Sequence, residues 1–247
     1  MCGIGGILKR NENINFDEVV DLAGDLEKRG QDACGFILLN EYGDVIRMFK
    51  LPAAITEVFI ELEEFLRPII EKASAILIHT RAATFGSPRN NKNNHPFRID
   101  NYYFAHNGYC VRTPAAIWKN KEIQTDSFNG IFEPLVTELK KRKKFAEVID
   151  NIYRKYSACG SFWLYNSETK QLILYCHTMP LTYEYSEKEF RFASTGFSHA
   201  LASFDILEIT LPYSGQMRAD VAQRRDDFND IKIRPHHEYV KALSEFK

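Results

Sequence analysis

Short apolar runs alternate along the chain with longer stretches of helical periodicity. Apolar residues recur every three or four positions in 16–28, 55–72 and 128–156. This pattern predicts one helix in each of the first two segments and two helices in the third, meeting near 140–144. The buried face predicted for 55–72 consists of Ile60, Leu62, Phe65, Leu66, Ile69 and Ile70. Apolar runs of strand length predict strands at 1–8, 35–40, 45–50, 74–79, 102–105, 161–165, 171–176, 189–193 and 206–210.

The order of these elements, strands, then helices, then strands, is typical of an α+β domain with mostly antiparallel sheets and helices outside them. The sequence contains no internal repeat and no linker, so we assign 1–217 to one domain. From residue 218 onward the apolar periodicity is lost, and we interpret 218–247 as a C-terminal tail, extended or packed on the domain. The polar segment 86–94 is rich in turn-forming residues and predicts a loop.

Composition narrows the class of protein. The chain has 247 residues, of which 45% are hydrophobic, and its 32 basic and 33 acidic residues give a formal net charge of −1. This balance removes the general electrostatic argument for binding nucleic acid or an anionic membrane. No apolar run approaches the roughly 18–20 residues that span a bilayer, and no secretory signal is evident. The five cysteines are scattered without a C-x-x-C motif, so we expect reduced thiols and a cytoplasmic protein.

Cys2 is the cysteine with a distinctive setting. It opens a run of small and apolar residues, and it follows Met1, which is the type of start that methionine aminopeptidase processes. Removal of Met1 would leave one residue carrying both a thiol and a free α-amine, with pKa values of roughly 8.5 and 7.7–8.0. Nucleophile and general base would then reside in the same residue. On its position alone, however, a buried structural cysteine is the simpler interpretation.

Polar residues gather where several strand-like runs end, and they form motifs in a fixed order. The motifs are Cys2-Gly3-Ile4, Arg29-Gly30-x-Asp32-x-x-Gly35, His79-Thr80-Arg81-x-x-Thr84-x-Gly86, Asn94-x-Pro96 and His106-Asn107-Gly108. In this order they resemble the class II glutamine amidotransferases, which are N-terminal-nucleophile (Ntn) hydrolases. The resemblance runs from residue 2 to about 130, with weaker likeness at 192–194 and 211–216.

The resemblance implies a four-layer αββα Ntn-hydrolase sandwich and hydrolysis of the glutamine side-chain amide, without a cofactor. It implies that Cys2 is the nucleophile, with its α-amine as the base, and that Asn107 and Gly108 form the oxyanion hole. The substrate-binding residues would be Arg81, for the α-carboxylate of glutamine, Asp126, for its α-ammonium, and Thr84 of the same motif as Arg81. A guanidinium fork suits a planar carboxylate, and an amide plus an unhindered backbone N–H suit a developing oxyanion.

We interpret other residues in the motifs as structural. His79, His95 and His106 have no zinc-site spacing, so we expect no metal, and we interpret His79 and His106 as strand-end scaffolding. Arg29 and Asp32 are interpreted as a structural ion pair or loop brace near the nucleophile strand, not as catalytic groups.

The sequence also departs from the family pattern. Ala82 stands where many members have a bulky aromatic, and Phe128 follows Ser127 where many have Glu. The chain ends soon after the amidotransferase module would end, which favours a stand-alone subunit that supplies ammonia to a separate synthetase or ligase chain; a homo-oligomer is compatible with this. We expect the region of Ala82 and Phe85, together with segment 86–94, to close over substrate or contact the partner. The alternatives are a γ-glutamyl amidase that acts alone and a non-catalytic Ntn-fold component of a larger assembly.

Overall fold

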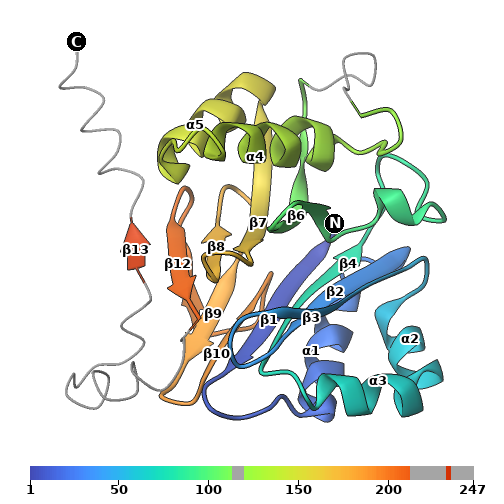
Figure 1. Ribbon diagram of the computed structural model, residues 1–247. Coiled ribbons are helices and arrows are strands. Elements are labelled where there is room, and N and C mark those ends of the chain that lie inside the picture. The colour runs from blue at the N-terminus through green and yellow to red at the C-terminus, as the bar shows by residue number, and fades with distance from the viewer. Residues whose placement is uncertain (113–119, 212–231, 235–247) are drawn as a thin grey trace, which may run out of the picture.

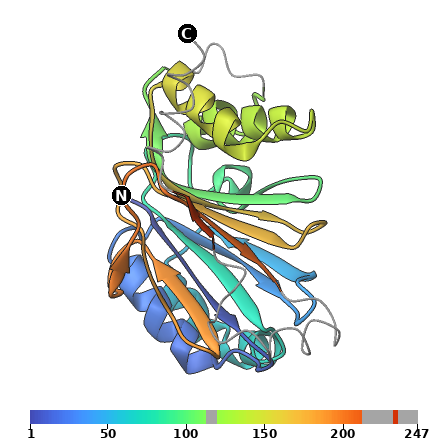
Figure 2. The ribbon, with the colours of Figure 1, turned by 90° about the vertical axis from the view of Figure 1, so that its left-hand side faces the viewer.

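The computed structural model describes residues 1–112, 120–211 and 232–234, which form four layers (Figures 1 and 2). Two sheets pack face to face, and helices cover the outer face of each. Every strand pairing in the described residues is antiparallel. The predicted α+β class and the αββα arrangement of two mostly antiparallel sheets flanked by helices are therefore confirmed.

The first sheet has seven strands within the described residues and carries the N-terminus near its centre. Its spatial order is β11 (His199–Ala200), β9 (Thr182–Tyr185), β10 (Glu189–Ala193), β1 (Gly3–Lys9), β4 (Ala75–Arg81), β2 (Ala33–Leu39) and β3 (Val45–Leu51). The second sheet has six described strands, in the order β13 (Lys232–Arg234), β12 (Ile206–Thr210), β8 (Gln171–Tyr175), β7 (Ala158–Asn166), β6 (Tyr102–Cys110) and β5 (Phe97–Ile99).

Helices are divided between the two outer faces. The first sheet is covered by α1 (Phe16–Glu27), α2 (Ile55–Glu61) and α3 (Glu63–Ile70). The second is covered by the π-helix η3 (Ser127–Phe132), α4 (Glu133–Leu139) and α5 (Phe145–Tyr156), and a short 3₁₀ turn, η1 (Asn91–Asn93), precedes β5. No helix within 1–112 or 120–211 has both the length and the apolar character to cross a bilayer.

Side chains that point alternately to the two faces of each strand form three apolar layers. On β1, Ile4 and Leu8 face the second sheet, whereas Ile7 faces the helices. On β6, Tyr103 faces the first sheet and Phe104 faces the helices of the second. Because side chains of a strand point alternately to opposite faces, each central strand contributes to two layers and is buried on both sides.

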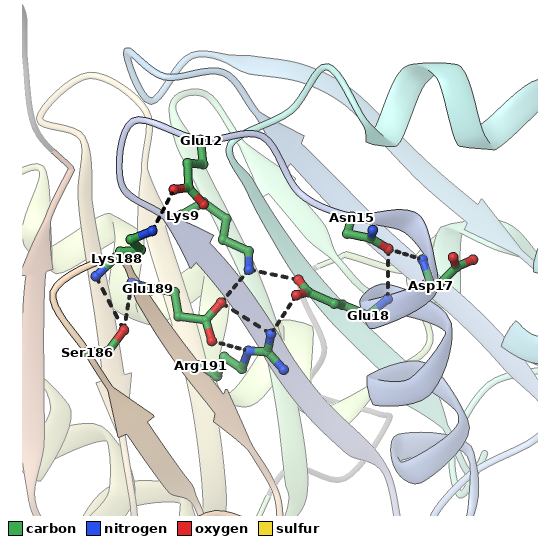
Figure 3. A network of polar contacts seen from close by, with 9 residues as sticks. All are labelled: Lys9, Glu12, Asn15, Asp17, Glu18, Ser186, Lys188, Glu189 and Arg191. Carbon is green, nitrogen blue, oxygen red and sulfur yellow. Dashed lines mark hydrogen bonds and ion pairs between the residues drawn. The ribbon is translucent and has the colours of Figure 1, made fainter.

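A network of ion pairs fixes β1 to its neighbours at the end of the strand remote from Cys2 (Figure 3). The Lys9 ammonium contacts Glu18 on α1 at 2.8 Å and also contacts Glu189 on β10. Arg191 bridges the same two carboxylates, at 3.2 Å to Glu18 and 2.9 Å to Glu189. The first turn of α1 is capped by Asn15, whose side chain accepts a hydrogen bond of 2.7 Å from the Asp17 backbone.

The segment 55–72 was predicted incorrectly as one helix. It divides at Leu62, and the side chains of Ile60, Leu62 and Phe65 are 74, 39 and 58% exposed, so three members of the predicted buried face lie at the surface. Leu66 and Ile70 are buried as expected. The pair of helices predicted to meet near 140–144 is confirmed by α4 and α5. The strand predicted to stop at residue 105 in fact continues as β6 through the His106-Asn107-Gly108 motif.

The C-terminal segment contributes one described strand. β13 pairs with β12 at the edge of the second sheet, with Leu207 opposite Ile233. The rest of the predicted tail, 218–231 and 235–247, lies outside the described residues. The boundary at residue 217 therefore stays a prediction.

Candidate active site

The candidate site lies where β1 begins and β4 ends, facing the second sheet. β1 and β4 are antiparallel neighbours with Gly3 opposite Thr80, so Cys2 comes beside Arg81. Cys2 precedes Ile4 by two positions and therefore points, like Ile4, towards β6. Asn107 follows Tyr103 and Ala105 on the same face of β6 and points back towards β1. Figure 1 shows the N-terminus at the end of the sandwich where β1, β4 and β6 meet.

A small pocket opens at this point. It brings together five of the six residues that the sequence assigned to the site: Cys2, Arg81, Thr84, Gly108 and Asp126. The sixth, Asn107, adjoins the lining at Gly108 without being part of it. The remaining lining residues are Ala82, Phe85, His95, His106, Thr125 and Ser127.

The surroundings of the Cys2 thiol favour its protonated form. Its Sγ lies 3.6 Å from the carbonyl oxygen of Ala82. Burial raises the pKa of the thiol above its ordinary value, and the opposing effects of this hydrogen bond and of the Arg81 charge are smaller. A thiol of this kind needs a base beside it before it can attack a substrate.

The Arg29-Gly30-x-Asp32 motif joins Cys2 to the end of β4. Arg29 Nε donates a hydrogen bond of 3.0 Å to the backbone carbonyl of Cys2. A Cβ at Gly30 would stand 2.4 Å from the carbonyl carbon of Arg81, so only glycine fits there. The Asp32 carboxylate accepts a 2.7 Å hydrogen bond from the Ala83 backbone. The described residues contain no Arg29–Asp32 ion pair, so of the two structural interpretations the geometry favours the loop brace.

The Arg81 guanidinium is buried, and much of its hydrogen-bonding capacity is used inside the protein. Nη1 donates to Asn94 Oδ1 at 2.7 Å, and Nη2 donates to the carbonyl of Gly86 at 2.9 Å and to that of Phe85. Asn94 is held in turn, because its Nδ2 donates to the Pro88 carbonyl at 2.7 Å. The segment between β4 and β5 therefore folds around the guanidinium and fixes its orientation.

Asp126 provides a buried carboxylate to the lining of the cavity. It immediately precedes η3, and its Oδ2 accepts a hydrogen bond of 2.8 Å from the Cys110 backbone. Burial raises its pKa, while backbone hydrogen bonds and the Arg81 charge act in the opposite direction. A buried carboxylate held by backbone donors can pair with an ammonium group.

Asn107 and Gly108 lie where β6 passes the candidate site. The Asn107 side chain is 1% exposed, and neither its Nδ2 nor its Oδ1 has a hydrogen-bond partner in the described structure. A buried amide without partners is costly, and such exceptions call for an explanation such as a ligand. A Cβ at Gly108 would lie 2.1 Å from the Cys159 carbonyl, so glycine is required where β6 approaches β7.

Three histidines surround the site in a neutral state. The rings of His79 and His95 are in contact, with centroids 4.1 Å apart and planes inclined by 34°, and His106 Nδ1 lies 2.9 Å from Ser127 Oγ. Burial lowers the pKa of His79 and of His106 to about 3, and it lowers that of His95 well below its ordinary value. No group of three metal-ligating side chains occurs in the described residues. Sequence analysis assigned no role at the cavity to His95, which lies within the Asn94-x-Pro96 motif, or to Ser127, which directly follows Asp126.

The fold of the chain is similar to that of known proteins. No family model and no curated protein matches the chain. It is similar to the solved glutamine phosphoribosylpyrophosphate (PRPP) amidotransferase from B. subtilis, complexed with ADP and GMP, with a TM-score of 0.64 and 20% identity over 95% of this chain and 49% of that one. A second similar structure is described as the allosteric regulatory enzyme of purine biosynthesis, with a TM-score of 0.58 and 21% identity over 85% and 47%. The chain thus spans about half the length of these proteins, and the similarity shows that it shares their fold.

Proposed function

We propose that the chain is a glutaminase that hydrolyses the side-chain amide of glutamine to glutamate and ammonia through a thioester on Cys2. The observation that carries the proposal is the shared cavity of Cys2, Arg81, Thr84, Gly108 and Asp126, which come from separate segments of the chain. A cation, an anion and a thiol in one small cavity complement the carboxylate, the ammonium and the amide carbon of glutamine. The fold of the PRPP amidotransferase and the motif order support the same assignment.

The reaction requires removal of Met1, which frees the α-amine of Cys2. The amine accepts the thiol proton, and Sγ attacks the amide carbon of glutamine to form a tetrahedral oxyanion. The Asn107 amide and the Gly108 backbone N–H donate to that oxyanion; such a donor is typically worth about 2.7–4 kcal/mol in the transition state. The protonated amine then gives its proton to the departing nitrogen, which releases ammonia and leaves the thioester. Water, deprotonated by the same amine, hydrolyses the thioester to glutamate and regenerates the thiol.

Arg81, Thr84 and Asp126 would bind the α-groups of glutamine. Arg81 would hold the α-carboxylate, and the hydroxyl of Thr84 from the same segment would add a neutral donor. Asp126 would hold the α-ammonium. Two opposite charges at fixed separation select a free amino acid over a peptide-bound glutamine, whose α-groups are neutral amides.

The product ammonia suggests a second chain, a synthetase or ligase that consumes it. Exposed apolar side chains stand close to the cavity: Phe85, which lines it, and Tyr109, which follows Gly108, are 48 and 46% exposed, and Val111 is 68% exposed. We take these three exposed apolar side chains as the candidate surface for contact with the partner. Val111→Ser would leave glutamine hydrolysis unchanged but lower glutamine-dependent transfer to the partner's substrate. Equal transfer by the variant and the wild type would count against this surface.

The test of the glutaminase uses intact-mass spectrometry with a diazoketone analogue of glutamine. We expect the purified chain to lack Met1 and to gain one adduct, together with glutamine-dependent formation of glutamate and ammonia. Cys2→Ala should lose both adduct and turnover, whereas Cys159→Ala, which removes another partly exposed free thiol, should keep both. A chain that retains Met1 and gains no adduct would favour the non-catalytic component. An adduct with turnover of γ-glutamyl compounds but not of glutamine would favour the amidase.

A further inference from the structure

β3 and β5 are the edge strands of the two sheets on the same side of the sandwich. Met48 on β3 pairs with Ile37, which belongs to the apolar layer between the sheets. Met48 therefore faces the second sheet, and so does Lys50, two positions along the strand. Arg98 on β5 pairs with Tyr103, a member of the same layer, and so faces the first sheet. Two cations and an apolar side chain thus lie on the facing surfaces of the two edge strands.

Each of the two cations lies over an aromatic ring. Lys50 Nζ is 5.6 Å from the centre of the Phe97 ring, and Arg98 Cζ is 5.3 Å from the centre of the Tyr103 ring. Because Phe97 and Arg98 are consecutive on β5, both cations belong to one short stretch of this edge. Arg98 Nε donates a hydrogen bond of 2.9 Å to the Asp100 carbonyl, so the donors of Nη1 and Nη2 remain for a ligand.

No carboxylate within 1–112, 120–211 or 232–234 forms an ion pair with Lys50 or Arg98. Asp100, the acidic residue next to β5, pairs with Lys140 instead. Burial and the charge of Arg81 lower the pKa of Lys50 to about 8, which shows that its charge is poorly compensated. Two like charges at one edge disfavour each other, and an anion bound between them would remove this cost.

We propose that Lys50, Arg98 and Met48 form a binding site for a phosphate group, separate from the candidate active site, whose pocket none of them lines. The guanidinium can hold two phosphate oxygens in parallel hydrogen bonds, and the ammonium adds a point charge with three donors. A phosphate has three acceptor oxygens and can contact both cations at once, which suits it better than a carboxylate. The Met48 side chain, 39% exposed, offers an apolar contact to whatever carries the phosphate.

A charge that points inward on an edge strand can also protect the edge from pairing with another chain. This protective role requires no anion and predicts no saturable binding of phosphate. A binding measurement therefore separates the two explanations. The proposal does not depend on glutaminase activity, so neither result bears on the proposed function.

The test is a titration of the full chain with inorganic phosphate and with phenyl phosphate, followed by ³¹P NMR. Lys50→Met and Arg98→Met each remove one cation and keep an unbranched apolar side chain. Arg47→Met is the matched control, because Arg47 is an exposed cation of the same strand that pairs with Leu38 and faces the helices. Urea unfolding establishes that each variant is folded.

We expect saturable binding to the wild type, weaker by about tenfold or more in Lys50→Met and Arg98→Met and unchanged within about twofold in Arg47→Met. Tighter binding of phenyl phosphate, with the advantage lost in Met48→Ser, would identify a phosphate monoester as the ligand, and equal affinities would identify free phosphate.

An absence of saturable binding would overturn the inference and leave the protective role. Equal affinity of the wild type, Lys50→Met and Arg98→Met would overturn it as well. Displacement of phosphate by glutamate would place the anion at Arg81 and have the same consequence. If Lys50→Met fails to fold, Arg98→Met decides, because Arg98 is exposed.

Discussion

The three buried histidines predict that the fold is unusually sensitive to mild acid. His79, His95 and His106 come from β4, from the segment before β5, and from β6, so they join the two sheets at the candidate site. Burial lowers the pKa of all three in the folded protein, to about 3 for His79 and His106. In the unfolded chain each titrates near its ordinary value of about 6.5. Below pH 7 the unfolded chain therefore binds more protons than the folded one, and the free energy of unfolding falls as the pH falls.

The magnitude follows from proton linkage. Between pH 7 and pH 5, a histidine that stays neutral in the folded protein and titrates near 6.5 in the unfolded chain costs about 2 kcal/mol. Three such histidines cost about 6 kcal/mol, which is comparable to the whole free energy of unfolding of a typical domain, about 5–15 kcal/mol. Asp126, whose pKa is raised by burial, acts in the opposite direction, but it is one group against three.

Urea unfolding followed by tryptophan fluorescence at pH 7, 6 and 5 measures this loss. His95→Phe keeps an aromatic ring between His79 and Phe97, whose ring centroids lie 4.1 and 4.3 Å from that of His95. It should reduce the loss to about 4 kcal/mol, since two of the three groups remain. It should also stabilise the fold at pH 7 by about 1 kcal/mol, because both ring nitrogens of His95 lack partners. His199→Gln, at an exposed position, is the control. A wild-type loss below about 2 kcal/mol, or the same loss in His95→Phe, would refute the reasoning.

Three further variants test other parts of the structure. Gly30→Ala should destabilise the protein by about 1–3 kcal/mol in urea unfolding, because its Cβ would clash with the Arg81 backbone; full stability would contradict the close approach. Arg81→Lys should raise KM for glutamine about tenfold or more, since an ammonium cannot replace the guanidinium fork, and an unchanged KM would remove Arg81 from the binding site. Ile60→Ser should change the free energy of unfolding by no more than about 0.5 kcal/mol, because this side chain is exposed; a larger loss would restore the single amphipathic helix expected from the sequence.

The contrast between β4 and the α2–α3 segment shows what apolar patterning predicts well. A continuous apolar run identified the strand that became β4, because a strand buried on both faces needs apolar residues at nearly every position. The helical segment was harder, because apolar residues at 62, 65, 66, 69 and 70 recur at the spacing of one helical face, which gives no sign of a break at Leu62. The chain instead breaks at Leu62, so that α2 buries Val58 and Phe59 while α3 buries Leu66 and Ile70. A change of helix direction depends on packing, which the periodicity does not encode.

For the candidate site, too, the sequence predicted some features and missed others. Motif order selected the residues that line the cavity, because functional side chains recur at fixed positions relative to strand ends. It did not indicate that Arg29 binds the Cys2 carbonyl, or that Arg81 is held by Asn94 and two backbone carbonyls. Those contacts depend on the register of β1 with β4 and on the path of the segment between β4 and β5, which arise only when distant parts of the chain pair.

The way Arg81 is held also constrains how it could bind a carboxylate. A guanidinium has five N–H donors, and a bidentate pair with a carboxylate uses two donors on one edge. Asn94 takes a donor of Nη1, and the carbonyls of Phe85 and Gly86 take those of Nη2. The remaining donors, on Nε and Nη1, belong to different edges. A bidentate grip on glutamine therefore requires Phe85 or Gly86 to release its carbonyl. Hydrogen exchange of the peptide spanning 82–90 should change when glutamate is added to the wild type and not to Arg81→Lys. Unchanged exchange in the wild type, with glutamate bound, would mean that Arg81 holds the carboxylate through a single hydrogen bond.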